Sequence, residues 1–352
     1  MHFKHLATEL LIHIFISCSS ITDIVHLSAV CRRFHRILNT SNKLHILYTV
    51  ASHEFSPIDD IIQLLTQNDS QPVHSHRHAP ISLPLLTQIV RVGRVARKWE
   101  AIYPFKKWRA DYENRRLLSE EEGWRIRRAV YRLWLYHRAF HTRRFDRFSR
   151  GLRGVMLERA MLLRNWSTAE LAEIEDMRGV IADVVRSHIC PSNGTIERKF
   201  RKRFPFAQGP DQITFNFWPS AAEMNAMAFG SFATDQFYTT PHSLESPAKY
   251  RSRFRNDLSH DPGYEGWGDE IPHYYVVQDM MKLDPGQVLW LREHAPLKEQ
   301  VEAYVGSLGE WFRNNGETFG DTLAWVMNER GEGIEELKAC IEEREMGIIK
   351  SA

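Results

Sequence analysis

A chain of 352 residues is long enough to form two domains around a sizeable core. Apolar residues make up 43% and charged residues 26%, as in soluble globular proteins, and the formal net charge of +2 argues against an overall field that selects nucleic acid or membranes. The four cysteines are far apart, which argues against a disulfide framework or a zinc knuckle and is typical of a reducing compartment: Cys18, Cys31, Cys190 and Cys340.

Residues 6–38 have the apolar spacing of three short helices. We expect Thr8 to cap the first helix, Thr22 the second and Ser28 the third. Helices this short are unstable alone in water, so they must pack on one another and on something else. The segment carries more apolar side chains than about forty residues can bury, and such a surplus usually marks an interface. The alternative is that these helices dock only on the rest of their own chain.

The residue order in this segment resembles the F-box, a short helical module. An F-box reads Leu-Pro-x-Glu-Leu/Ile-Leu at its start, Ile-Phe in its first helix, Asp-Leu opening its second, and Val-Cys-Arg-x-Phe/Trp in its third. The family commonly has proline at position 7 and leucine at position 18, where this chain has Ala7 and Cys18. Proline pre-sets a first helical turn at little cost, so Ala7 should weaken partner binding only slightly. The matching residues are Leu6, Glu9, Leu10, Leu11, Ile14, Phe15, Asp23, Leu27, Val30, Cys31, Arg32 and Phe34.

The resemblance implies an adaptor that binds a Skp-family linker and, through it, a cullin-type ubiquitin ligase. Such a protein would be no enzyme, would need no cofactor or metal, and would work inside the cell, in the cytoplasm or nucleus. The main alternative is a scaffold or binding protein that uses its F-box but recruits no target for degradation. The linker-facing residues that the resemblance implies are Leu6, Leu10, Leu11, Ile14, Phe15, Ile24, Leu27, Val30, Cys31 and Phe34.

Neither a secretory leader nor a membrane-spanning segment is expected. The apolar run after Lys4 could be read as a secretory leader, but Glu9 and His13 interrupt it. No later segment approaches the run of about eighteen uncharged apolar residues that a membrane span requires.

The chain divides into three parts on composition: an F-box over residues 1–40, a connector over residues 41–80, and a helical domain over residues 81–352. The connector is expected to contain a helix that begins after Pro57 and a polar, mobile loop over residues 69–80. The third part is the candidate substrate-binding domain.

That domain is expected to be irregular and mainly α, because its apolar residues recur at helical spacing and no repeat is found. In this respect the chain is similar to the fungal F-box proteins whose C-terminal region has no assigned activity. Capping-box patterns at Ser119, Ser167 and Ser220 predict three helix starts, and four more helical stretches lie between residues 284 and 346. Strand-like alternation is limited to residues 213–217 and 274–277.

Residues 91–150 are strongly basic, with eighteen Lys and Arg against seven Asp and Glu, and with aromatic residues between them. Such a segment can bind nucleic acid, or an acidic or phosphorylated protein, through arginine forks and stacking. Arg125, Arg127 and Arg128 are the candidate ligand-binding residues. The interpretation that we favour is structural: the aromatic residues line the core and the arginines pair with an acidic C-terminal helix that holds Glu335, Glu336, Glu342, Glu343 and Glu345.

Two further runs are distinctive. His74, His76 and His78 alternate along the chain, but no nearby Cys or carboxylate completes a tetrahedral site, so we expect a solvated loop. Three glycines surround Trp267, which is a candidate substrate-binding residue on a recognition loop. The alternative is that Trp267 fills the helical core.

Overall fold

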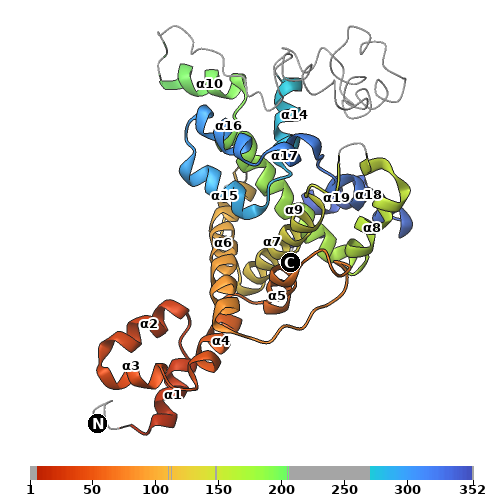
Figure 1. The fold of residues 1–352 in the computed structure, drawn as a ribbon. Helices are drawn as coiled ribbons and strands as arrows, with labels where there is room; N and C mark the ends of the chain where they lie inside the picture. The colour runs from red at the N-terminus through yellow and green to blue at the C-terminus, as the bar shows by residue number, and fades with distance from the viewer. Residues whose placement is uncertain are drawn as a thin grey trace, which may run out of the picture. The chain divides into compact units, whose positions relative to one another are not determined.

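The computed structural model describes residues 6–109, 111, 113–146, 149–203, 205 and 270–350, and the regular structure of these residues is entirely helical (Figure 1). The mainly α fold class is thereby confirmed. A 3₁₀ turn spans Ser149–Gly151 and a π-helical turn spans Val185–Ile189. The α-helices are α1 (Thr8–Ile16), α2 (Ile21–Val30), α3 (Arg32–Leu38), α4 (Lys43–Glu54), α5 (Ile58–Thr66), α6 (Leu83–Lys107), α7 (Glu120–Phe140), α8 (Arg153–Arg164), α9 (Thr168–Val184), α10 (Asn193–Arg203), α14 (Glu270–Met280), α15 (Pro285–His294), α16 (Lys298–Ser307), α17 (Glu310–Asn314), α18 (Phe319–Glu329) and α19 (Ile334–Glu342).

The three short N-terminal helices form where the sequence predicts them, but their caps differ. Ala7 occupies the N-cap of α1 and makes no side-chain cap, while Cys31 precedes α3 in the same way. The N-cap of α2 is Ser20, whose Oγ accepts a hydrogen bond from the Asp23 amide at 3.1 Å. The predicted caps Thr8, Thr22 and Ser28 are therefore wrong, because each of these residues already lies inside a helix.

A small core holds these helices and α4 together. Phe15 of α1 and Phe34 of α3 meet edge to face, with ring centroids 6.2 Å apart. Ile46 and Val50 extend the same core from α4. The N-terminal helices thus pack on α4, which begins within the segment expected to be a connector. The buried residues of this core are Leu11, Phe15, Ile24, Phe34, Ile37, Leu38, Ile46 and Val50.

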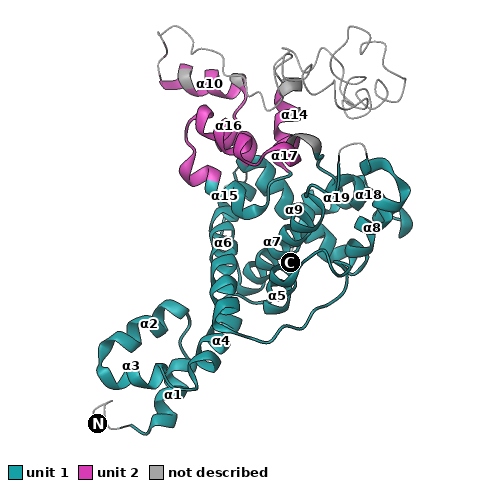
Figure 2. Ribbon diagram, in the orientation of Figure 1, with its two compact units in different colours: residues 1–184, 282–290, 315–352 teal, residues 185–281, 291–314 magenta. Residues whose placement is uncertain are grey.

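The chain forms two compact units (Figure 2). Unit 1 comprises residues 1–184, 282–290 and 315–352, and unit 2 comprises residues 185–281 and 291–314. The chain therefore leaves unit 1 twice and returns to it twice. Residues 81–352, which the sequence treats as one domain, contribute to both units.

The long helices α6 and α7 lie at the centre of unit 1, where they pack on each other and on α5 and α9. Helix α7 begins with the predicted capping box, in which Ser119 and Glu122 exchange side-chain and backbone hydrogen bonds. Many aromatic residues of the basic segment are core, as expected. Trp99 is buried and donates from Nε1 to the Pro285 carbonyl at 3.0 Å. The Tyr136 hydroxyl is also buried, within 3.0 Å of the Thr322 hydroxyl.

The C-terminal stretches are helical, as predicted, but one expected strand is wrong. Residues 274–277 lie inside α14 of unit 2, with Val277 and Met280 buried at helical spacing. The second expected strand, residues 213–217, and the capping pattern at Ser220 lie outside the described residues. Within the described helices, none combines the length and apolar character that a bilayer crossing requires.

Two buried histidines meet edge to face at the end of α7. The rings of His137 and His141 are 4.6 Å apart, and His141 Nδ1 lies 3.0 Å from the Lys282 carbonyl, to which a neutral ring donates. Burial lowers the pKa of His141 to about 3, and the nearby cations Lys282, Arg159 and Arg178 act in the same direction. The folded protein therefore holds this ring neutral.

We predict that unit 1 loses stability as pH falls from about 6.5 toward 3, because the unfolded chain binds a proton at His141 that the folded chain excludes. This residue should contribute a slope of about 1.4 kcal/mol per pH unit. In His141→Asn, the side-chain amide replaces Nδ1–H as donor to Lys282, and the slope should decrease by that amount. Denaturant unfolding at about pH 6 and about pH 4, where the full slope applies, measures it, and equal slopes in the two proteins would contradict the prediction.

Candidate partner-binding surface

The N-terminal helices bury four of the ten residues that the resemblance placed in the linker interface. Leu11, Phe15, Ile24 and Phe34 are each at most 5% exposed. They form the core between α1, α2 and α3, so their side chains do not lie on a surface that a partner can contact. These four residues hold the helices together, and their place in the linker interface stays a prediction.

The other six residues of the assignment reach the surface. Leu10 is 52% exposed and Val30 is 70% exposed, while Leu6, Ile14, Leu27 and Cys31 are half-buried. Val25, which the sequence analysis did not single out, is 53% exposed on α2. Its place directly after the buried Ile24 is the signal that was missed, because consecutive residues of a helix point about 100° apart. Three strongly exposed aliphatic residues on so small a module favour a protein-binding surface.

A hollow of about 450 Å³ opens between the end of α2 and α3. Cys31, Arg32 and Arg36 contribute to its wall. A partner that covers Val30 and Cys31 would therefore also meet two arginine side chains, which favours acidic groups on that partner.

A comparison with protein-family models matches residues 4–45 to the F-box-like family. Residues 4–45 form an F-box-like domain. The N-terminal resemblance read from the sequence is therefore confirmed. No curated protein and no solved structure matches the chain significantly. The match ends at residue 45, inside α4, whereas the core continues past it to Ile46 and Val50 of the same helix.

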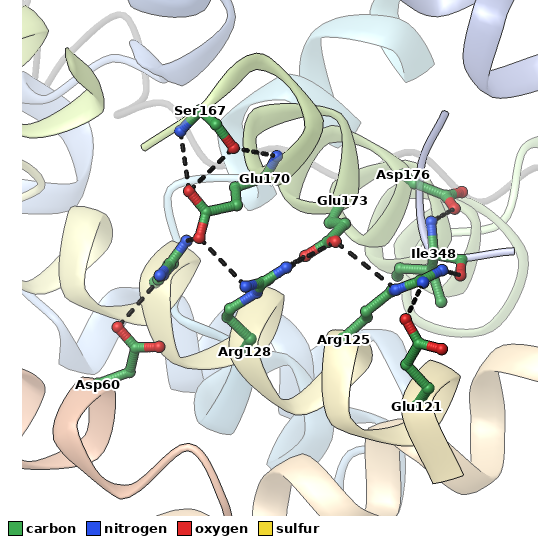
Figure 3. A network of polar contacts seen from close by, with 10 residues as sticks. Asp60, Glu121, Arg125, Arg128, Ser167, Glu170, Glu173, Asp176 and Ile348 are labelled. Carbon is green, nitrogen blue, oxygen red and sulfur yellow. Dashed lines mark hydrogen bonds and ion pairs between the residues drawn. The ribbon is translucent and has the colours of Figure 1, made fainter. Parts of the chain in front are cut away.

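Several arginines of the basic segment, in contrast to the exposed residues of the F-box, pair with acids inside unit 1 (Figure 3). Arg128 of α7 binds Glu173 of α9 with Nη2 2.7 Å from Oε1 and Nε 3.0 Å from Oε2. Its Nη1 lies 3.1 Å from Glu170, and its guanidinium stacks over the Trp124 ring at 4.2 Å. Arg132, one turn further, lies 2.8 Å from Glu170 and 3.2 Å from Asp60 of α5.

The other two arginine candidates are paired as well. Arg125 forms an ion pair with Glu121 and donates to the Ile348 carbonyl at 3.1 Å. Arg127 donates from Nε to the Ser56 carbonyl at 2.9 Å and from Nη1 to Glu100 at 2.8 Å. None of Arg125, Arg127 and Arg128 is thus available to a ligand without losing a bond inside the protein. The structure therefore does not support their assignment as substrate-binding residues.

Burial and pairing act in opposite directions on the carboxylates of this network. Burial raises the pKa of Glu173, although Arg128 opposes the shift, and it raises the pKa of Asp60 against Arg132. Burial also opposes ionisation of Glu170, but hydrogen bonds from Ser167 and Arg132 outweigh it and lower the pKa of that residue. The predicted capping box at Ser167 thus also orients one acid of the network.

Structural pairing of the arginines was expected, but the acidic partners are different from those predicted. The C-terminal helix α19 pairs Glu335 with its own Lys338 at 2.8 Å, whereas α9 and α6 supply the acids that meet α7. The signal was present in the sequence as two complementary stripes. Arginines recur along α7 at three- and four-residue spacing, as Arg125, Arg128 and Arg132. Acids recur along α9 at three-residue spacing, as Glu170, Glu173 and Asp176.

The remaining candidates do not form a site among the described residues. Trp267 lies outside the described part of the chain. The histidine loop packs on its surroundings, since Asn165 donates to the His74 carbonyl at 2.7 Å and Gln63 donates to the Val73 carbonyl at 3.1 Å. No group of three or more His, Cys, Asp or Glu that could hold a metal occurs in the described ranges. All four thiols are free.

Proposed function

We propose that this protein is a substrate-recognition adaptor of a Skp–cullin–F-box ubiquitin ligase. The observation that carries the proposal is an F-box-like domain over residues 4–45 that exposes Leu10, Val25 and Val30 on α1 and α2. F-box domains bind a Skp-family linker, which in turn binds a cullin. The rest of the chain is long enough to hold a target protein independently of the F-box.

The proposed mechanism is proximity, and the protein itself does no chemistry. The F-box would hold the linker and cullin, while the helical body would hold the target. A ubiquitin-carrying enzyme on the same assembly then meets a lysine of the target at a high effective concentration. The protein would act inside the cell, in the cytoplasm or the nucleus, where such ligases work.

A scaffold and a nucleic-acid-binding protein are the two alternatives to the adaptor. A scaffold that binds the linker but recruits no target would have the same F-box, so it is separated from the adaptor only by experiment. A nucleic-acid-binding function loses support, because Arg125, Arg127 and Arg128 are all engaged in ion pairs with acids of the same unit.

The F-box assignment is tested by placing charges on its exposed aliphatic residues. Leu10→Asp adds an acid to the first turn of α1 and Val30→Lys adds a base at the end of α2, and each charge has the sign that this helix end favours. The double variant should fold, yet it should bind the linker about 100-fold more weakly, because two charges would be desolvated in the interface. Binding to purified linker and co-purification of the cullin measure the effect.

The matched control is Leu152→Asp combined with Leu297→Asp. Both residues are exposed and both occupy helix N-caps, where aspartate is favourable. This control should bind the linker as the native chain does. Equal linker binding by the F-box variant and the control would refute the proposal.

The adaptor and the scaffold are separated by protein turnover. If the chain is an adaptor, at least one protein bound by its helical body should become longer-lived when the F-box variant replaces the native chain. If every bound protein keeps its lifetime, the scaffold is correct and the adaptor is not.

A further inference from the structure

A groove of about 720 Å³ runs along one side of α6 in unit 1. The wall across from α6 consists of Lys43 and Leu47 of α4 and Ile21 at the start of α2. The α6 wall is a stripe at helical spacing from Leu83 to Lys98, a length of about 22 Å at 1.5 Å per residue. The residues Ile89, Val92 and Ala96, which are buried, do not line it. We call this feature the α6 groove.

The α6 groove has an aliphatic interior and positive charge along its length. Leu47, Val90 and Val95 contribute to the aliphatic part. Every charged residue that lines the groove is basic: Lys43, Arg91, Arg94 and Lys98. One carboxylate, that of Glu54, is close to the groove at Ile21, where it accepts the Ile21 amide hydrogen bond at 2.8 Å, but Glu54 does not line the groove.

Two charges of the groove, Arg91 and Arg94, differ from those of the α7 network in having no acid opposite them among the described residues. Arg91 and Arg94 are exposed, and neither makes a hydrogen bond or ion pair with another described residue. Lys43 reaches only a neutral partner, the Asn39 side chain at 3.0 Å. In the same unit, by contrast, Arg125, Arg127 and Arg128 of α7 each bind a carboxylate. Arg91 and Arg94 are therefore two cations of the groove that an acidic occupant could bind without displacing a described partner.

The shape and the side chains of the groove favour a peptide over nucleic acid. The lining includes no aromatic residue, so it has no platform on which bases could stack. Aliphatic residues spaced along four helical turns can instead receive the apolar side chains of a second helix at three- and four-residue intervals. Arginines at the edge of such a groove can bind carboxylates in a bidentate manner.

We propose that the α6 groove binds an acidic, amphipathic helical segment of a partner protein. The apolar face of that segment would pack on Leu47 and Val90, and its carboxylates would meet Arg91 and Arg94. The inference rests on the proposed adaptor function in one respect, which is that the partner is the protein recruited for ubiquitination. Peptide binding by the groove does not itself require the linker.

The test is selection of a random sixteen-residue peptide display library on the full-length chain, alone and with its linker bound. We expect enriched peptides to combine Asp or Glu with aliphatic residues at three- and four-residue spacing. Synthetic copies should bind Arg91→Glu/Arg94→Glu at least about tenfold more weakly in fluorescence anisotropy. Arg186→Glu/Lys202→Glu is the matched control, because both side chains are exposed and the charge change is the same. It should bind the peptides as the native chain does.

Three outcomes would overturn the inference: no enriched peptide, enriched peptides without acidic residues, or equal binding to the groove variant and the control. Failure of the adaptor function is a separate result. If acidic peptides bind at the groove but the F-box variant retains full linker affinity, the groove stands and the adaptor function falls. If the linker binds only the intact F-box and no acidic peptide is selected, the adaptor function stands and the groove inference falls.

Discussion

Replacing Glu173 with alanine is expected to lower the free energy of unfolding of unit 1 by about 3–5 kcal/mol. Glu173 is 3% exposed and accepts hydrogen bonds from Nε and Nη2 of Arg128. Without it, the half-buried Arg128 guanidinium keeps Glu170 as its remaining acid, 3.1 Å from Nη1. The cost is large because a buried charge that loses its partner keeps its desolvation penalty and loses the attraction that offset it. Denaturant unfolding followed by circular dichroism measures the change.

Two further variants show whether the unpaired charge is the cause. Adding Arg128→Met to Glu173→Ala removes the charge as well as its partner, so the double variant should regain part of the loss. Glu335→Ala, which removes an exposed acid paired only with Lys338, should change stability by less than about 0.5 kcal/mol. A strictly additive double variant, or an equal loss at Glu335, would be inconsistent with this account of the network.

The second large effect is expected at Phe15. The ring is fully buried between the helices of the F-box and packs edge to face on Phe34. Phe15→Ala should therefore destabilise this module by about 3–5 kcal/mol, through lost apolar burial and the cavity that remains. We expect linker binding to fall as well, although Phe15 has no exposed surface with which to contact the linker. Hydrogen exchange at the amides of α1–α3, compared with linker affinity, measures both effects.

The comparison with exposed positions separates packing from contact. Leu10→Asp/Val30→Lys should lose linker binding while the amides of α1–α3 keep their protection. Phe15→Ala should lose both together, and Phe15→Leu, which retains most of the volume, should lose less of each. Native protection in Phe15→Ala with weakened binding would mean that Phe15 touches the linker directly, as the sequence resemblance implied.

Local features of the fold could be predicted because their signals are local. The order of residues from Leu6 to Phe34 identified the F-box, and the capping boxes at Ser119 and Ser167 marked helix starts within three residues of sequence. The sequence could not show which of two adjacent apolar residues is buried and which is exposed. Leu10 is 52% exposed and Leu11 is 1% exposed, yet both are leucines of one apolar stripe, and only the packing of α1 on its neighbours decides which is covered.

Long-range pairing was beyond the sequence analysis for a different reason. Many acidic residues along the chain could pair with Arg128. It pairs with Glu173, 45 residues away, because α7 packs against α9. The α6 groove was equally hidden, since Arg91 and Arg94 look like any other arginines of a basic segment. Their distinction, the absence of described partners, becomes visible only when the neighbouring arginines are seen to be paired.

The path of the chain through the two units has a consequence during synthesis. The buried side chains of Arg159 and Tyr136 each lie 3.0 Å from the Thr322 hydroxyl, within hydrogen-bond distance. The side-chain amide of Asn315 donates to the Phe145 carbonyl at 2.6 Å. Both Asn315 and Thr322 follow the segments that build unit 2. The polar groups of α7 and α8 therefore exchange water for these protein partners only after residue 322 has been synthesised. Until then the apolar surfaces that α18 covers in the folded chain stay exposed, which is the condition under which partly folded chains aggregate.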